Sequence, residues 1–383
     1  MDRFTAALIL LSWLSFVTMN AQVPDYIQNF TLLESAVAKG AVCLDGSPPA
    51  YAYVEGYGSG SSNWIVYMEG GGWCESLMDC INRSKKYHGS SKYENDTNFV
   101  GILDSDSQLN QYFYNWNKVF IHYCDGSVYM SDIKKVDPSN NLTFRGARIY
   151  HAMMEEMLHK GMGNAHNAIL SGGSAGGLST ILHCDRFRYL FPNTTRVKCI
   201  SDSGFFIHGE GALANKSGPH FAHVIETHEL GALLPKSCTS KRDPNLCLFP
   251  EYLIEDVSTP LFLVETAFDS FQIKYSFKPK SIQWGLCELS LEQCNSQQIR
   301  IIEEFRPIVL KTLMKLDKSC SRGVFVDSCY LHGHIARRST WTRSPLVRNT
   351  TMEQAIADWY FDRSPFQEID NNASPQVCPH SDP

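Results

Sequence analysis

The sequence predicts an α/β fold in which a largely parallel central sheet is flanked by helices. Short apolar runs alternate along the chain with longer stretches of helical periodicity, as is typical of parallel strands joined by crossover helices. Several runs are apolar throughout, which is expected for strands covered on both faces. The strand candidates are Trp64–Met68, Lys118–Tyr123, Asn167–Ser171, Val197–Ser201, Pro260–Val264 and Arg322–Val326. The helix candidates are Arg145–Lys160, Leu178–Phe191 and Ser290–Leu316.

Composition limits the class of protein. The chain has 383 residues with 34 Lys plus Arg against 40 Asp plus Glu, a formal net charge of −6. An apolar share of 43% supports a large core and excludes a disordered chain. The absence of a basic block argues against a nucleic-acid partner. We find no internal repeat and no long linker, so we expect residues 22–383 to form one domain and the protein to be a monomer.

The N-terminus has the pattern of a secretory signal peptide, which we place at residues 1–21. Arg3 supplies a charged start, an apolar run extends from Phe4 to Val17, and small or polar residues follow as a cleavage site. The run is shorter than the about 20 apolar residues that span a bilayer. A buried N-terminal helix is the alternative. No second stretch has membrane length, so we expect a secreted protein without a membrane span.

Glycosylation signals and cysteines also point to secretion. Asn-x-Ser/Thr triplets are candidate glycosylation sites at Asn29, Asn82, Asn95, Asn141, Asn193, Asn215, Asn349 and Asn372. In a secreted chain the 13 cysteines are expected to form disulfides, and the odd count leaves at least one without an internal partner. The plausible pairs are Cys74–Cys80, Cys184–Cys199, Cys238–Cys247, Cys287–Cys294 and Cys43–Cys124. Zinc is the alternative, but no C-x-x-C pair and no H-E-x-x-H motif occurs, so we expect no metal.

Residues 172–177 read Gly-Gly-Ser-Ala-Gly-Gly between a predicted strand and a predicted helix. This is the G-x-S-x-G pattern in the context it requires, because the serine must occupy a tight strand-to-helix turn among small residues. Ser174 is therefore the candidate nucleophile of an α/β-hydrolase-like fold. The alternative is a glycine-rich turn whose serine only caps the helix.

Residues 69–74 read Glu-Gly-Gly-Gly-Trp-Cys directly after the strand Trp64–Met68. Three glycines after an early strand resemble the loop that supplies N–H donors to an oxyanion. We assign the oxyanion hole to the N–H groups of Gly71, Gly72 and Ala175. A flexible turn closed by a disulfide is the alternative, and a P-loop is excluded because no Lys-Ser/Thr follows the glycines.

The acid and the base should follow the serine in the order Ser, Asp or Glu, His. Asp269, beyond the strand Pro260–Val264, is the favoured acid, with Asp202 and Glu265 as competitors. His332 is the favoured base because it lies beyond the last predicted strand, with His334 close by. The predicted reaction is attack of Ser174 on an ester carbonyl, with an acyl-enzyme that water then hydrolyses and without a cofactor.

These motifs resemble the pectin acetylesterases of plants, a carbohydrate esterase family related to the carboxylesterase Notum. The resemblance covers nearly all of the chain after the signal and rests on an ordered set of segments, Cys43–Tyr51, Glu69–Cys74, Gly89–Ser91, Tyr123–Gly126, Phe144–Gly146, Gly172–Gly177, Ser201–Phe206 and Cys329–His332. It implies an α/β-hydrolase-like esterase secreted to the cell wall, with Ser174, Asp269 and His332 as its triad and acetylated pectin as its substrate.

One position departs from the plant members, which usually carry a cysteine directly after the catalytic histidine where this chain has Gly333. The disulfide partner of Cys329 is therefore open, with Cys320 and Cys378 as candidates. A polar groove with aromatic faces would suit sugars, and we assign Trp73, Phe205 and Phe206 to it. Two other functions stay open, a Notum-like lipid (palmitoleoyl-protein) carboxylesterase with a deep apolar pocket and an inactive wall-binding glycoprotein.

Overall fold

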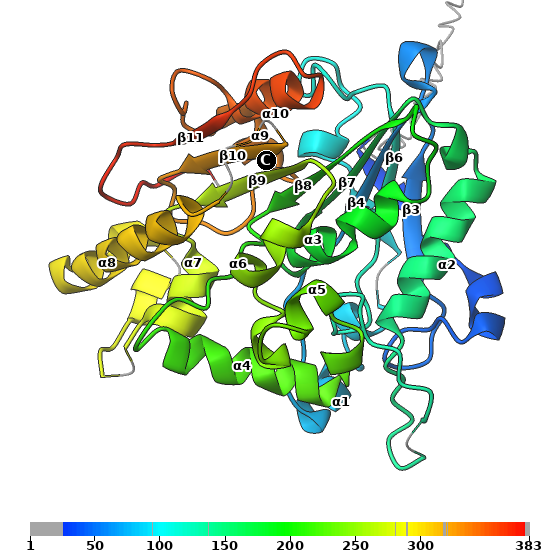
Figure 1. Cartoon of the computed structure of the whole chain (residues 1–383), viewed down its shortest axis with the longest axis horizontal. Coiled ribbons are helices and arrows are strands. Elements are labelled where there is room, and N and C mark those ends of the chain that lie inside the picture. The colour runs from blue at the N-terminus through cyan, green and yellow to red at the C-terminus, as the bar shows by residue number, and fades with distance from the viewer. Residues whose placement is uncertain are drawn as a thin grey trace, which may run out of the picture.

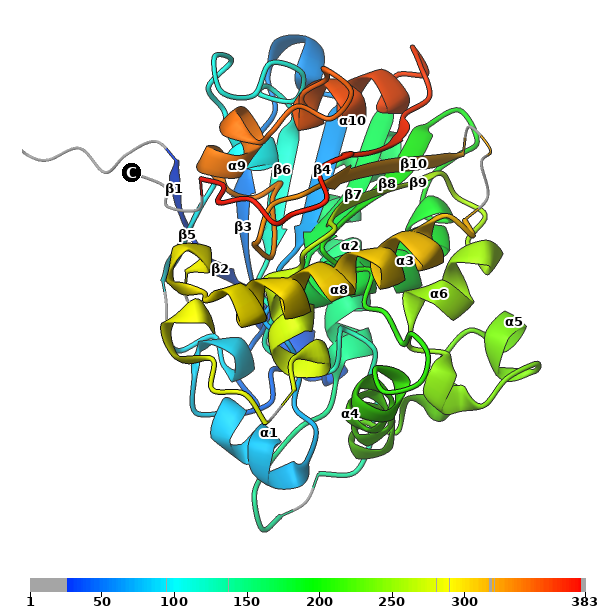
Figure 2. The ribbon, with the colours of Figure 1, turned by 90° about the vertical axis from the view of Figure 1, so that its left-hand side faces the viewer.

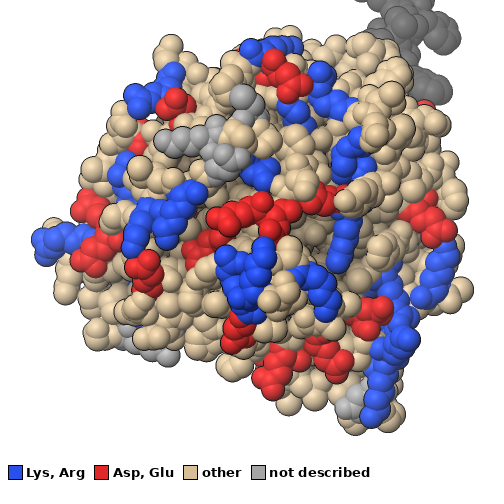
Figure 3. Space-filling view, viewed as in Figure 1, with Lys and Arg blue, Asp and Glu red and all other residues tan. Residues whose placement is uncertain are grey.

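A computed structural model describes residues 26–93, 95–136, 138–279, 281–288, 290–316, 319 and 321–379. The predicted signal peptide lies outside these residues. Lys and Arg are interspersed with Asp and Glu on the face shown in Figure 3, as expected from their similar numbers. None of the helices in the described segments is long and apolar enough to cross a membrane.

A nine-stranded sheet runs through the molecule in the order β11-β10-β9-β8-β7-β4-β6-β3-β2 (Figure 1). From β11 to β6 all neighbours are parallel, whereas β3 is antiparallel to β6 and β2 is antiparallel to β3. The strands are β2 (Thr31–Leu32), β3 (Ala50–Val54), β4 (Asn63–Met68), β6 (Asn117–Ile121), β7 (Asn167–Gly173), β8 (Arg196–Asp202), β9 (Leu261–Thr266), β10 (Arg322–Asp327) and β11 (Gln367–Ile369). A separate antiparallel pair joins β1 (Ile27–Asn29) to β5 (Asp96–Asn98).

Helices cover both faces of this sheet. The α-helices of the described residues are α1 (Leu77–Arg83), α2 (Gly146–His159), α3 (Ala175–Arg188), α4 (Ala214–Thr227), α5 (Lys236–Thr239), α6 (Pro250–Leu253), α7 (Ser270–Gln272), α8 (Ser296–Leu313), α9 (Arg338–Arg343) and α10 (Met352–Tyr360). Figure 2 shows α9 and α10 on one side of the sheet and α3, α6 and α8 on the other. The predicted largely parallel sheet flanked by helices is confirmed.

Successive side chains of β4 point to opposite faces of the sheet and therefore pack into two different cores. Trp64, Val66 and Met68 pack into the larger core with α2 and α3. Ile65 and Tyr67 point to the opposite face and pack with α9 and α10. Both faces are therefore apolar, which is why the sequence of this strand is a continuous apolar run.

All six predicted strands are present within two residues of their expected bounds. The helix predicted from Ser290 instead begins at Ser296, because the Asn295 side chain accepts hydrogen bonds from Gln297 N and Gln298 N while the Gln298 side chain bonds back to Asn295 N. Such a capping box defines a helix start more sharply than hydrophobic periodicity does.

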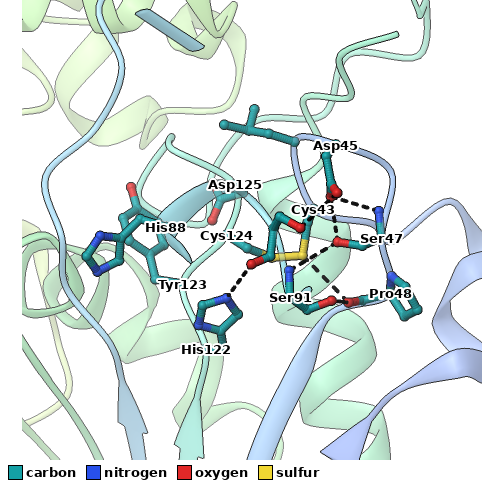
Figure 4. Close-up of a disulfide and its surroundings, with 12 residues drawn as sticks. Cys43, Asp45, Ser47, Pro48, His88, Ser91, His122, Tyr123, Cys124 and Asp125 are labelled. Atoms are coloured by element: carbon teal, nitrogen blue, oxygen red, sulfur yellow. Dashed lines mark hydrogen bonds between the residues drawn. A yellow bond between two sulfur atoms is a disulfide. The ribbon is translucent and has the colours of Figure 1, made fainter. Parts of the chain in front are cut away.

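The structure contains the five predicted disulfides and a sixth between Cys329 and Cys378. Cys378 is therefore the partner that the sequence left open, and Cys320 lies outside the described residues. Figure 4 shows Cys43–Cys124, around which Ser91 donates to the carbonyl of Pro48 at 2.7 Å. This disulfide ties the segment before β3 to the residues that follow β6.

Candidate active site

Ser174, Asp269 and His332 lie beyond the carboxyl ends of three parallel strands. Ser174 follows β7, Asp269 follows β9, and His332 lies in the loop after β10. Only β8 separates β7 from β9, and β9 is paired directly with β10. The carboxyl edge of a parallel sheet is where such folds gather reactive groups, so residues far apart in the chain meet there.

Ser174 occupies the strained turn between β7 and α3, with φ 56° and ψ −123°. A left-handed φ is uncommon for a residue other than glycine and marks a site where the surrounding structure imposes the conformation. The turn fits only because its neighbours are small. A Cβ on Gly172 would lie 2.4 Å from the Gly176 carbonyl oxygen, and one on Gly176 would lie 2.0 Å from the Met68 carbonyl oxygen.

His332 joins the serine to the aspartate. Its Nε2 lies 2.7 Å from Ser174 Oγ and its Nδ1 lies 2.8 Å from Asp269 Oδ2. Asp269 is buried and its other oxygen accepts the N–H of Gln272 at 2.8 Å, so the carboxylate is fixed at the start of α7. The His332 ring stacks on Phe271 at 5.0 Å and remains 17% exposed. The imidazole is thus within reach of both the serine and an incoming substrate.

The competing acids do not contact His332. Asp202 binds the other histidine, since its two oxygens accept from His334 Nδ1 at 3.1 Å and from the His334 backbone N–H at 2.7 Å. Glu265 accepts the Phe205 N–H at 3.0 Å. Burial, followed by the nearby charge of Asp269, raises the pKa of Glu265 well above its ordinary value.

His334 is enclosed by acids. Its Nδ1 lies 3.1 Å from Asp202 and its Nε2 lies 3.2 Å from Asp327, with all three side chains buried. Burial alone would lower the pKa of His334, but the carboxylates of Asp327 and Asp202 outweigh burial and raise the pKa to about 10. The imidazolium therefore holds the loop that carries His332.

The free energy of unfolding is expected to fall as the pH rises from about 6.5 to about 10. Because the pKa of His334 is about 10 in the folded chain and near 6.5 when unfolded, its contribution is complete below pH 6.5 and is lost toward pH 10. The free energy of unfolding should lose up to about 1.4 kcal/mol per pH unit in that interval. Urea unfolding at several pH values should show a shallower dependence in the double variant His334→Gln/Asp327→Asn. Equal slopes in the two proteins would contradict this role.

The glycine loop after β4 lies against the serine turn. A Cβ on Gly70 would come within 2.2 Å of the Gly173 carbonyl oxygen, so only glycine permits this approach. Gly71 has φ 134° and Gly72 has φ 66°, conformations that other residues rarely adopt. Among the described residues no acceptor takes a hydrogen bond from the N–H of Gly71 or Gly72. Both groups remain available to a ligand, as does the N-terminus of α3 at Ala175.

Two side chains that the sequence analysis missed hold this loop. Arg83 donates from Nη2 to the Gly71 carbonyl at 2.8 Å and from Nε to the His88 carbonyl at 2.9 Å. The His88 ring, drawn in Figure 4, would lie 2.6 Å from a Cβ on Gly71. Burial lowers the pKa of His88. Neither residue belongs to a local motif, since each reaches the loop only through the fold.

Two cavities of about 370 Å³ each share Phe271 and Tyr275 as a common wall. The first contains Gly72 of the glycine loop together with Trp73 and Phe206, two of the residues assigned to substrate. The third, Phe205, does not fit that assignment, because its side chain is 1% exposed and does not line either cavity. Phe205 packs instead into the larger core, after the end of β8.

One group of potential metal ligands brings together Cys74, Cys80 and His228. The two sulfur atoms are bonded to each other, so neither is available as a thiolate ligand. His228 Nε2 lies 2.9 Å from the Cys74 carbonyl oxygen, and burial lowers the pKa of this histidine to about 4. The histidine therefore supports the turn at the disulfide.

The candidate glycosylation sites lie at the surface. Seven of the eight asparagines are exposed, and Asn372 is half-buried. A glycan could be attached at each exposed position without entering the core.

The fold defines the class of protein. The crystal structure of the Wnt deacylase Notum from Drosophila aligns with a TM-score of 0.76 and 25% identity, covering 92% of this chain and 99% of that chain. The fold is thus α/β-hydrolase-like, as expected.

The chain belongs to the pectinacetylesterase family, whose model matches residues 21–380. Pectin acetylesterase 11 of Arabidopsis thaliana is 46% identical over 360 residues, covering 91% of this chain and 92% of that protein. The palmitoleoyl-protein carboxylesterase notum1a of Danio rerio is 27% identical over 381 residues, covering 95% of this chain and 71% of that protein. The resemblance inferred from the motifs is confirmed, and the chain is an enzyme of the carboxylesterase class.

Proposed function

We propose that this enzyme is a secreted serine esterase that removes O-acetyl groups from cell-wall pectin. The observation that carries the proposal is the position of His332, 2.7 Å from Ser174 Oγ and 2.8 Å from Asp269 Oδ2. A hydroxyl, an imidazole and a buried carboxylate in this order can generate a nucleophile at neutral pH. No cofactor is needed for this chemistry.

The geometry supports a two-step mechanism through an acyl-enzyme. His332 takes the proton of Ser174 as Oγ attacks the acetyl carbonyl carbon, and Asp269 stabilises the imidazolium that forms. The N–H groups of Gly71, Gly72 and Ala175 bind the oxyanion. His332 then donates its proton to the sugar oxygen, which leaves as a hydroxyl. Water, deprotonated by the same histidine, attacks the acetyl-enzyme and releases acetate.

The cavity beside the glycine loop supports a polysaccharide substrate. Trp73 and Phe206 meet edge to face there at 5.2 Å and offer aromatic surface. Glu75, Asp79 and His220 also line this cavity, so it is not the purely apolar tunnel that a long acyl chain would prefer. The identity of 46% to a pectin acetylesterase against 27% to a palmitoleoyl-protein carboxylesterase favours the same choice.

Secretion to the cell wall is part of the proposal. The signal pattern at residues 1–21, the six disulfides and the exposed glycosylation triplets support it. Disulfides persist in oxidising compartments and are rare in the cytosol. We further propose that residues 22–383 act as one esterase domain and as a monomer.

Acetate release tests the substrate directly. The purified enzyme is incubated with acetylated pectin and, in parallel, with acetylated xylan, and acetate is measured over time. We expect faster release from pectin. Hydrolysis of p-nitrophenyl acetate should exceed that of the octanoyl ester, because charged side chains interrupt the aromatic wall of the cavity. Equal or faster octanoyl hydrolysis would favour the lipid esterase, and no turnover of any ester would favour a wall-binding glycoprotein.

A further inference from the structure

The second cavity contains a charged side chain, Arg337, that takes no part in the proposed mechanism. It has a volume of about 370 Å³ and is lined by His332, Tyr330, Lys274, Glu288 and Arg337. It therefore begins at the imidazole and extends away from the glycine loop, which lines the first cavity instead. A polymer that presents an acetyl group to Ser174 must pass its neighbouring sugars along such a space.

The charges in this cavity do not cancel. Glu288 is the acidic residue among its lining, and it is already paired with Lys278 and, at 3.5 Å, with Lys274. Arg337 is half-buried, and no carboxylate of the described residues lies within ion-pairing distance of it. A guanidinium in a partly desolvated cavity, with no carboxylate of the described residues paired to it, is a site for an anion.

The backbone around Arg337 is held in place. Its N–H donates to the His334 carbonyl at 3.3 Å, and His334 is bound in turn by Asp202 and Asp327. Gly333 lies beside the guanidinium, since a Cβ at this position would be in ordinary van der Waals contact with Arg337 Nη2 at 3.8 Å. A fixed backbone below a head group that lines the cavity reduces the entropic cost of binding a charged ligand.

The two cavities differ in the sign of the charge on their lining side chains. The first is lined by Glu75 and Asp79, and its histidine, His220, lies 2.7 Å from Glu75. An anionic group is disfavoured there and favoured beside Arg337. The substrate therefore has a preferred direction across the common wall of Phe271 and Tyr275.

We propose that Arg337 binds the carboxylate of a uronic acid unit near the acetylated sugar, so that the enzyme prefers an acidic polysaccharide with free carboxylates over its methyl ester. The inference rests on the proposed function, since it assumes that a sugar polymer occupies both cavities. Arg337 is a specificity-determining residue, and the acetyl group reacts at Ser174 as before.

The test compares kcat/KM on an acetylated oligogalacturonide with free carboxylates and on its methyl ester. Wild type should favour the free acid, and Arg337→Gln should reduce this ratio about 10-fold, the loss typical of one charge-assisted hydrogen bond. Arg337→Lys should give an intermediate ratio because it keeps the charge without the planar fork. Arg343→Gln is the matched control, because Arg343 is exposed at the end of α9 and lines neither cavity, and it should leave the ratio unchanged.

A second measurement separates this inference from the proposed function. Unacetylated trigalacturonate should inhibit p-nitrophenyl acetate hydrolysis, and Arg337→Gln should raise its inhibition constant about 10-fold. A wild type that releases no acetate from either oligosaccharide would contradict the proposed function, and the inhibition would still decide the role of Arg337. A ratio and an inhibition constant that are equal in wild type and Arg337→Gln would overturn the inference.

Discussion

Ser174→Ala is expected to lower kcat for p-nitrophenyl acetate and for acetylated pectin by about 10⁴-fold or more. The substitution removes the one oxygen that lies 2.7 Å from His332 Nε2, so no acyl-enzyme can form. The fold should survive, because alanine meets the same backbone strain at φ 56° as serine does. Steady-state rates and thermal unfolding of the two proteins provide the measurement.

The matched control for this variant is Ser179→Ala. Ser179 lies on the same helix, α3, and its hydroxyl donates to the carbonyls of Ala175 and Val128 without reaching His332. Its loss should leave turnover near the wild-type rate. Turnover that persists in Ser174→Ala at a comparable rate would remove this serine from the mechanism.

Asp269→Asn is expected to lower kcat by about 10⁴-fold while KM changes little. The carboxylate accepts the Nδ1 proton of His332 at 2.8 Å and so leaves Nε2 free to take the serine proton. An asparagine can turn its amide nitrogen toward Nδ1, which would favour the opposite tautomer and remove the negative charge that stabilises the imidazolium. The pH–rate profile and kcat of the two proteins provide the measurement.

Glu265→Gln is the control, because it alters a second buried acid close to Asp269. Burial raises the pKa of Glu265 well above its ordinary value, which favours the neutral form, and glutamine preserves the shape of that form. The accepting oxygen toward Phe205 N is also preserved. A large loss of kcat in Glu265→Gln together with a small one in Asp269→Asn would exchange the roles of the two acids.

The interior of the fold was predictable because its strands are buried on both faces and therefore contain continuous apolar runs, as Trp64–Met68 in β4 and Leu261–Val264 in β9 show. The edge strands β2 and β11 are short and partly exposed, so their sequences carry no such signal. Helix α3 was expected at Leu178 but begins at Ala175. Gly176 and Gly177 are weak helix formers, yet the close approach of α3 to β4 permits nothing larger, since a Cβ on Gly176 would lie 2.0 Å from the Met68 carbonyl oxygen.

Some residues of the candidate site were likewise predictable from the sequence, and others were not. Ser174 and the glycine loop have local signatures, since a strained turn and an open backbone each require particular small residues in sequence. Asp202 ends the buried strand β8 and Asp269 follows the buried strand β9, so position in the sequence indicated only a preference between them. The structure pairs Asp202 with His334 and Asp269 with His332. Phe205 was assigned to the substrate groove together with Phe206, but its side chain is buried and lines neither cavity.

The sequence by itself determined the class of fold, the family and the residues of the serine turn, because apolar runs, glycine requirements and cysteine spacing are local properties of the chain. Tertiary structure decided which aspartate contacts which histidine and which cysteine pairs with Cys329. It also decided which cation of the second cavity has no carboxylate of the described residues paired to it. The physical reason is that these depend on distances between segments far apart in the sequence. Arg337 is the clearest case, since only the fold places it in one cavity with Glu288, Lys274 and His332.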